Sequence, residues 1–118
     1  MLDPPRLSPA QRKALAKISA QNPVLLSDIS LWEIALLHEL GRITLNLPLL
    51  EWLKKAASPP DVQIMPITPE IAAETASLPD SFHRDPADRI IVATARILGE
   101  SLMTSDAGII RSGLVTVI

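Results

Sequence analysis

Apolar runs and helical spacings alternate along the chain, and this pattern predicts strands and helices in turn. Short apolar runs predict buried strands over residues 24–27, 62–67, 101–104 and 114–118. The intervening segments have helical spacing or helix start and stop residues, and they predict helices over about 8–20, 28–41, 48–57, 68–78, 87–98 and 107–111. Such alternation predicts an α/β fold with a mainly parallel sheet.

Three acidic residues lie where these apolar segments predict burial. Glu33 is in the middle of an apolar helical run, Asp88 opens another such run, and Asp106 follows the predicted strand over 101–104. Carboxylates against a core cost free energy unless they are paired or bind a cation. All three can reach the carboxyl edge of a parallel sheet, where ligands bind. Because oxygen ligands suit Mg²⁺ or Mn²⁺, they predict a shared divalent metal site.

Each acid also has a purely structural interpretation. Glu33 can reach solvent from the border of its apolar stripe. Asp88 can stabilise the helix dipole, an effect of roughly 0.3–1 kcal/mol. Asp106 can act as a turn or cap residue. The joint placement of the three on separate segments favours the metal site.

Several neighbouring polar residues are candidate supporting groups. In the predicted loop over 79–86, His83 is expected to be solvated, and Arg84 is a candidate phosphate contact. Asp85 is expected to cap the following helix, with membership of the acid cluster as the alternative. Ser30 and Thr104 can hydrogen-bond within the site or, alternatively, to nearby backbone.

Composition narrows the functional classes. The 118 residues suggest one domain, and a hydrophobic content of 47% argues against disorder. There are no cysteines, which excludes disulfides and thiolate metal sites and fits a cytoplasmic location. No apolar run is long enough to predict a membrane span, and the first residues predict no signal peptide. With a net charge of −2, a metal must supply much of the attraction if the substrate is nucleic acid.

Four segments, taken in order, resemble a PIN domain and, more narrowly, the VapC toxins of bacterial type II toxin–antitoxin systems. They are residues 30–35 (SLWEIA), 40–43 (LGRI), 83–89 (HRDPADR) and 104–106 (TSD). The resemblance implies a Mg²⁺- or Mn²⁺-dependent ribonuclease that is neutralised by a VapB-type antitoxin and usually dimerises. Glu33, Asp88 and Asp106 match three acidic residues of the family. Thr104 matches a frequently polar position, and Asp85 an acid found in a subset of VapC-like sequences.

One part of the family pattern has no counterpart in the chain. Family members begin with an apolar strand that ends in Asp, and this strand lies centrally in the sheet. Roughly 15–20 residues, one strand and a short helix, are therefore expected to be missing. Asp3 lies in a segment that resembles the later loop, so it is not expected to replace the lost ligand.

The missing strand leaves more than one functional hypothesis open. The preferred hypothesis is a ribonuclease whose start is assigned too late. The alternative is a truncated, weakly active or inactive remnant that binds antitoxin. Without the family resemblance, an acid-lined α/β domain also fits a phosphatase or another metal hydrolase. No Gly-rich nucleotide-binding loop or serine-hydrolase elbow is found in the sequence.

Overall fold

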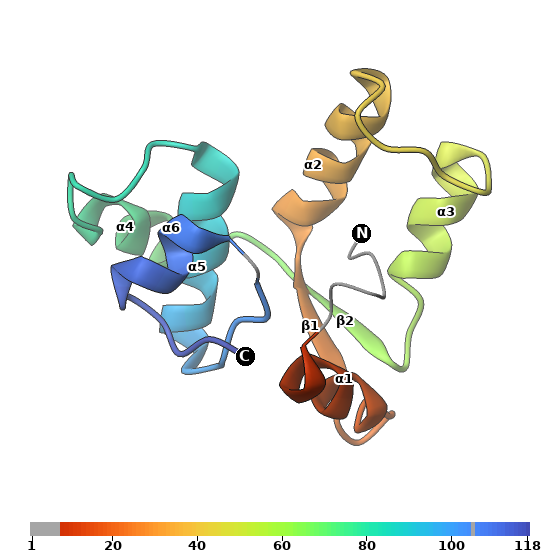
Figure 1. Cartoon of the computed structure of the whole chain (residues 1–118), viewed down its shortest axis with the longest axis horizontal. Helices are drawn as coiled ribbons and strands as arrows, with labels where there is room; N and C mark the ends of the chain where they lie inside the picture. The colour runs from red at the N-terminus through yellow and green to blue at the C-terminus, as the bar shows by residue number, and fades with distance from the viewer. Residues whose placement is uncertain (1–7, 105) are drawn as a thin grey trace.

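The computed structural model describes residues 8–104 and 106–118, so Asp3 lies outside the described residues. The described chain consists of six helices and two short strands (Figure 1). In order they are α1 (Pro9–Ala16), β1 (Val24–Ser27), α2 (Asp28–Glu39), α3 (Leu49–Ala56), β2 (Val62–Met65), α4 (Pro69–Ser77), α5 (Pro86–Leu98) and α6 (Ala107–Ser112). The predicted α/β class is confirmed, because β1 and β2 form a parallel pair.

The sheet is smaller than the sequence predicts. β1 pairs with β2 in register Val24 to Val62 through Ser27 to Met65. The predicted strands over 101–104 and 114–118 were wrong as continuous strands, since only an isolated parallel bridge joins Leu102 to Val117. The backbone hydrogen bonds between these two segments involve Leu102 alone on one side, which bonds to Thr116 and Ile118. β2 ends before Pro66, which lacks the N–H that a ladder requires.

Helix α1 is bounded by the predicted capping box but is shorter than expected. The Ser8 side chain accepts a hydrogen bond from the Gln11 backbone, and the Gln11 side chain accepts one from the Ser8 backbone. The helix ends at Ala16, not near residue 20, because Asn22 folds back and donates its side-chain amide to the Lys17 carbonyl. The Gln11 amide also donates to the carbonyls of Thr104 (3.3 Å) and Ile118 (2.9 Å).

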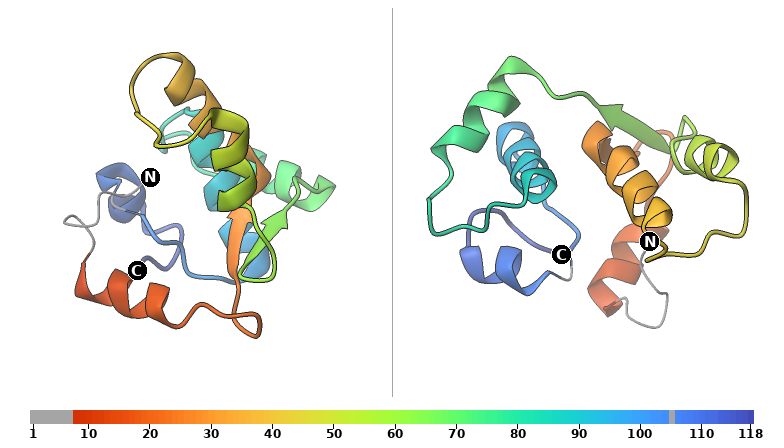
Figure 2. Two further views of the ribbon diagram at one scale, coloured as in Figure 1. Left: turned by 90° about the vertical axis from the view of Figure 1, so that its right-hand side faces the viewer. Right: turned by 90° about the horizontal axis from the view of Figure 1, so that it is seen from above.

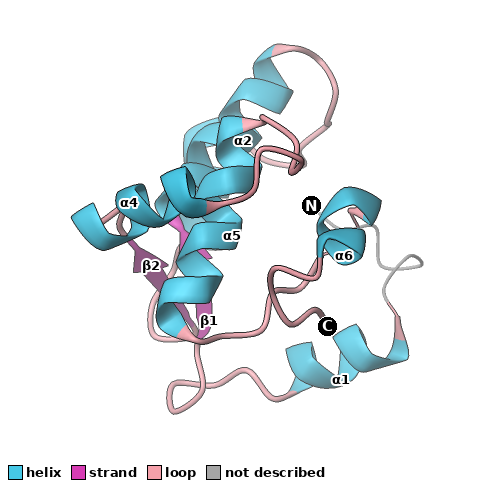
Figure 3. Cartoon of the chain, turned by 90° about the vertical axis from the view of Figure 1, so that its left-hand side faces the viewer, coloured by secondary structure: helices cyan, strands magenta, loops and turns pink. Residues whose placement is uncertain are grey.

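The main core lies between α4, α5 and α6. Its central cluster consists of Leu78, Phe82, Val92 and Ile109, each at most 5% exposed. Seen from above, α4, α5 and α6 lie on one side of the molecule and α2, α3, β1 and β2 on the other (Figure 2). Helix α1 lies below α6 (Figure 3), consistent with its hydrogen bonds to the C-terminal segment. Among the described residues, no helix has the length and apolarity needed to cross a membrane.

Arg89 on α5 organises the loop that precedes its own helix. Its guanidinium donates to four backbone carbonyls, those of Thr75, Leu78, Phe82 and His83, at 3.2–3.4 Å. Charged donors form stronger hydrogen bonds than neutral ones, so this group orders residues 75–83. The loop that carries His83 is thereby held against the start of α5.

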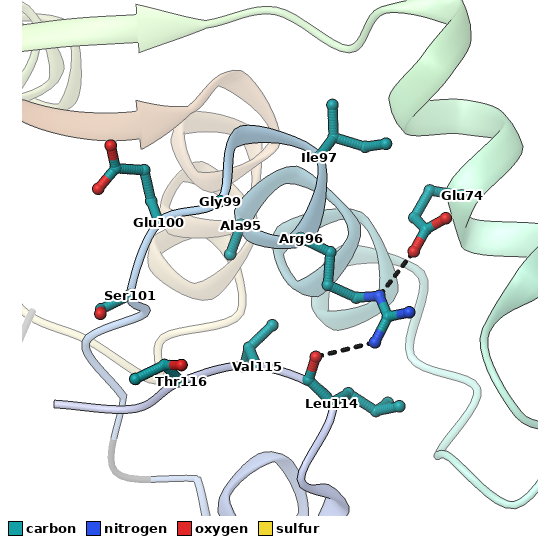
Figure 4. Close-up of a pocket in the computed structure, with 10 residues that line it drawn as sticks. All are labelled: Glu74, Ala95, Arg96, Ile97, Gly99, Glu100, Ser101, Leu114, Val115 and Thr116. Carbon is teal, nitrogen blue, oxygen red and sulfur yellow. Dashed lines mark hydrogen bonds and ion pairs between the residues drawn. The ribbon is translucent and has the colours of Figure 1, made fainter.

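Arg96 on α5 holds the C-terminal segment against this helix. Its Nε donates to Glu74 Oε2 at 2.6 Å, and its Nη1 donates to the Leu114 carbonyl at 2.9 Å (Figure 4). The hydrogen bond to Arg96 is the main reason that the Glu74 pKa is lowered. The arginine thus joins α4, α5 and the segment that leads to Val117.

Candidate metal centre

Two helices bring three carboxylates together. Glu33 extends from the middle of α2, Asp85 is the N-cap of α5, and Asp88 lies in the first turn of α5. One oxygen from each can be chosen so that all three lie within 4.8 Å of one another. Glu33 and Asp88, which the sequence placed in one site, are therefore neighbours, and Asp85 joins them. Asp85 also accepts a hydrogen bond from the Asp88 backbone, as expected for a cap.

Asp106 lies outside this group of three but close enough to influence it. Its Oδ1 accepts a hydrogen bond from the Ile109 backbone at 2.9 Å, so it caps α6. The predicted structural role of Asp106 as a cap is therefore present. Asp106 is also close to the acidic site, because its charge raises the Asp88 pKa and it lines the same cavity as Glu33 and Asp88. Its backbone N–H donates to Thr104 Oγ1, so the local bonding expected of Thr104 is present.

The prediction for His83 was wrong. It was expected to be a solvated loop residue, but its side chain is 36% exposed and its Nε2 lies 2.7 Å from Asp88 Oδ2. The loop turns back toward α5 because Arg89 binds its carbonyls. No local sequence pattern predicts the contact between His83 and Asp88. Gly108 allows α6 to approach, since a Cβ there would lie 3.0 Å from His83 Nδ1.

The remaining candidates divide into two groups. Ser30 and Thr104 line the cavity that also contains Glu33 and Asp88. Arg84 is exposed and forms an ion pair with the exposed Asp80 of the same loop at 3.7 Å, so its side chain lies at the loop surface. The structure thus gives no support to Arg84 as a member of the cluster.

Burial and mutual repulsion raise the pKa of both central acids. For Glu33, desolvation is the largest cause, followed by the charges of Asp88 and Asp85. For Asp88, desolvation again dominates, and the charges of Asp85 and Asp106 add to it, while the hydrogen bond from His83 acts in the opposite direction. A cluster whose charges repel one another is an environment that a hard divalent cation would stabilise. The donor set therefore fits Mg²⁺ or Mn²⁺.

These shifts predict an unusual pH dependence for the metal-free protein. A carboxyl group with a raised pKa binds more protons in the folded state than in the unfolded state. Stability should therefore rise as the pH falls from neutral toward roughly pH 5, just above the ordinary carboxyl range. Glu74 has a lowered pKa, so its contribution to stability is lost only when the pH falls below this range. Urea unfolding in EDTA at neutral pH and at roughly pH 5 measures whether the free energy of unfolding increases as the pH falls. The Glu33→Gln variant should show a smaller difference between the two pH values.

Comparison with known proteins shows the family of the chain. A family model described as the PIN domain matches residues 3–113. The chain belongs to the PIN-domain family. This PIN domain is 42% identical over 104 residues to Ribonuclease VapC22 from Mycobacterium tuberculosis (strain ATCC 25618 / H37Rv), covering 88% of the chain and 76% of that relative. No solved structure gives a significant match. The resemblance to PIN domains and VapC toxins found in the sequence is thereby confirmed.

Proposed function

We propose that this PIN domain is a VapC-like, metal-dependent endoribonuclease that hydrolyses RNA phosphodiester bonds. The observation that carries the proposal is the convergence of Glu33, Asp85 and Asp88 from two helices of a PIN-family chain. The similarity to a protein named as a ribonuclease supports the choice of RNA as substrate. Catalysis is assigned to Glu33, Asp88 and Asp106, with Asp85 and Ser30 in support.

In this proposal the acids hold one or two ions of Mg²⁺ or Mn²⁺. A metal bound there supplies charge neutralisation and activation of water. Glu33 and Asp88 provide the most buried carboxylates, and Asp106 reaches the same cavity from the start of α6. His83 donates its Nε2–H to Asp88 Oδ2 and fixes the orientation of that carboxylate. Thr104 positions Asp106 by accepting its backbone N–H.

The partners in this proposal are RNA, a VapB-type antitoxin and a second copy of the chain, all in the cytoplasm. The net charge of −2 means that bound metal contributes much of the attraction to phosphate. Trp32 of α2, Leu40 at the C-cap of α2 and Leu50 of α3 are all more than half exposed. Exposed apolar side chains of this size are typical of protein–protein contact surfaces. They support binding of an antitoxin or a second copy on that side of the molecule.

Binding of the metal can be tested without RNA. Adding Mn²⁺ or Mg²⁺ at about 100 times its dissociation constant should stabilise the folded chain by about 2.7 kcal/mol. Thermal unfolding of the full chain after EDTA treatment measures this gain, and Asp88→Asn should abolish most of it. Equal stabilisation of the wild type and Asp88→Asn would place the metal elsewhere.

Cleavage itself is tested with a fluorescently labelled RNA pool and the full chain. Activity is expected with Mg²⁺ or Mn²⁺ and should be lost in EDTA. Hydrolysis of small phosphate esters without RNA cleavage would select a metal phosphatase instead. Binding of a VapB-type peptide without any metal-dependent cleavage would select an antitoxin-binding module.

A further inference from the structure

Helix α1 has one buried residue, and that residue is polar. Gln11 is 4% exposed, whereas the other side chains of α1 are exposed or half-buried. A buried amide costs free energy unless its hydrogen bonds are made, so an aliphatic residue would be the simpler means of docking a helix. The amide at this position therefore indicates a role for the hydrogen bonds that it forms.

These hydrogen bonds fix the orientation of the Gln11 amide. Its Oε1 accepts from the Ser8 N–H at 3.1 Å, and its Nε2 donates to the Thr104 and Ile118 carbonyls at 3.3 and 2.9 Å. Both N–H groups of the amide are thereby used. Turning the amide over would place its oxygen against two carbonyl oxygens, so the surrounding groups permit one orientation.

The two carbonyls belong to segments that meet at an isolated bridge. The bridge joins Leu102 to Val117, and the Gln11 amide links the same two segments again at Thr104 and Ile118. Helix α1 lies below α6 (Figure 3), across the end of this short pairing. Gln11 therefore connects the segment that precedes α6 to the C-terminal segment.

The C-terminal segment is anchored to the helix that carries Asp88. Arg96 of α5 donates to the Leu114 carbonyl at 2.9 Å (Figure 4). Because Asp88 lies in the first turn of the same helix, the segment over 114–118 is held relative to that carboxylate. The contact of Gln11 with Ile118 passes this anchoring on to Thr104.

The segment that precedes α6 leads to Asp106. Thr104 Oγ1 accepts from the Asp106 N–H at 3.1 Å, and Asp106 Oδ1 accepts from the Ile109 N–H at 2.9 Å. Asp106 is not one of the three clustered carboxylates, although it lines the same cavity. Its position beside Glu33 and Asp88 therefore depends on how the residues before it are held.

We propose that Gln11 is a positioning residue for Asp106. Its amide holds the Thr104 carbonyl, and Thr104 in turn holds the Asp106 backbone. The Asp106 carboxylate is thereby kept at the cavity that Glu33 and Asp88 also line. Gln11 acts through Thr104 and is not itself a ligand. The inference rests on the proposed function, because it requires a divalent ion at the acids.

Binding of Mn²⁺ to the full chain, measured by isothermal titration calorimetry without RNA, tests this role. Gln11→Met keeps the length of the side chain but removes the donor. It should weaken binding about tenfold, the lower end of the range for groups that orient a metal ligand. Ser8→Ala removes the other side chain of the capping box but keeps the Gln11 amide, so it should bind Mn²⁺ as tightly as the wild type. Gln11→Lys restores a donor and should recover most of the affinity.

A double-mutant cycle measures whether Gln11 acts through Asp106. Asp106→Asn removes the charge but keeps a side-chain oxygen that can cap α6. In that background Gln11→Met should cause no further loss of Mn²⁺ affinity, because the carboxylate that it positions is gone. An equal loss in both backgrounds would overturn the proposal, since α1 would then support the site only through general stability.

Amide hydrogen exchange in EDTA provides a readout without metal. Exchange at Asp106 and Ile109 should be faster in Gln11→Met than in Ser8→Ala, because the segment before α6 has lost its link to α1. Exchange at Val92, in the core of α5, should be the same in both variants. Equal exchange of Asp106 and Ile109 in the two variants would contradict the positioning role.

The calorimetry separates failure of this inference from failure of the proposed function. Wild-type affinity in Gln11→Met, with weakened binding in Asp106→Asn, would overturn the positioning role alone. Absence of Mn²⁺ binding by the wild type would overturn both. Circular dichroism checks that the variants fold. Gln11→Glu keeps the acceptor for the Ser8 N–H without a donor, and it replaces Gln11→Met if that variant does not fold.

Discussion

Replacing Glu33 by glutamine should lower RNA cleavage by at least about 100-fold, because even residues behind a metal ligand typically change activity 10–100-fold. The same change should leave the metal-free protein as stable as the wild type or more stable. Burial and the charges of Asp88 and Asp85 raise the pKa of Glu33, so the ionised side chain costs stability that an uncharged glutamine does not. Loss of activity with retained stability separates a role in the site from a role in the fold.

A control for this variant lies on the same helix. Glu39→Gln removes an identical charge from the exposed C-terminal end of α2 and should leave cleavage within about twofold of the wild type. Initial rates on labelled RNA and urea midpoints in EDTA would be measured for both variants. If Glu33→Gln retained full activity at saturating Mg²⁺, the assigned metal site would be wrong.

Replacing Arg89 by methionine should destabilise the protein by about 3 kcal/mol. The methionine preserves much of the aliphatic packing but leaves four backbone carbonyls without their charged donor. Hydrogen bonds to charged groups contribute roughly 1.5–3 kcal/mol each, and the shared loop makes the four less than additive. Because the loop carries His83, cleavage should also decrease at temperatures where the variant is still folded.

Arg84→Met is the matched control in the same region. Arg84 is exposed, and its ion pair within the described part of the chain is an exposed one with Asp80 at 3.7 Å, so its removal should change stability by less than about 1 kcal/mol. The free energies of unfolding of Arg84→Met and Arg89→Met would be compared by urea unfolding at the same pH. Equal and small losses for both would show that the carbonyl contacts of Arg89 do not hold the loop.

The local elements were predictable wherever a short-range signal specified them. The capping box at Ser8 and the glycine after Leu98 marked helix ends that the structure contains. The segment over 101–104 has strand composition, but a strand requires partners on its edges, and those partners are distant in sequence. Composition therefore predicted a ladder where the described chain forms a single bridge. The missing N-terminal strand stays a prediction.

The candidate site was predictable in part for the same reason. Glu33 and Asp88 stood out because each interrupts an apolar helical pattern. Asp85 was recognised as a cap, and only the packing of α2 against α5 places its carboxylate beside Glu33. The contact between His83 and Asp88 depends on a loop whose path is determined by Arg89, and that long side chain gives no local signal in the sequence.

The hydrogen bonds of Gln11 have a consequence for the order in which the chain folds. Its two carbonyl partners lie 93 and 107 residues further along the sequence. An isolated helix of eight residues is marginal in water, so α1 depends on these distant contacts. During synthesis α1 emerges before Thr104 and Ile118, so it cannot make these contacts until both residues have been added. It is therefore among the last elements to join the fold and the first to open.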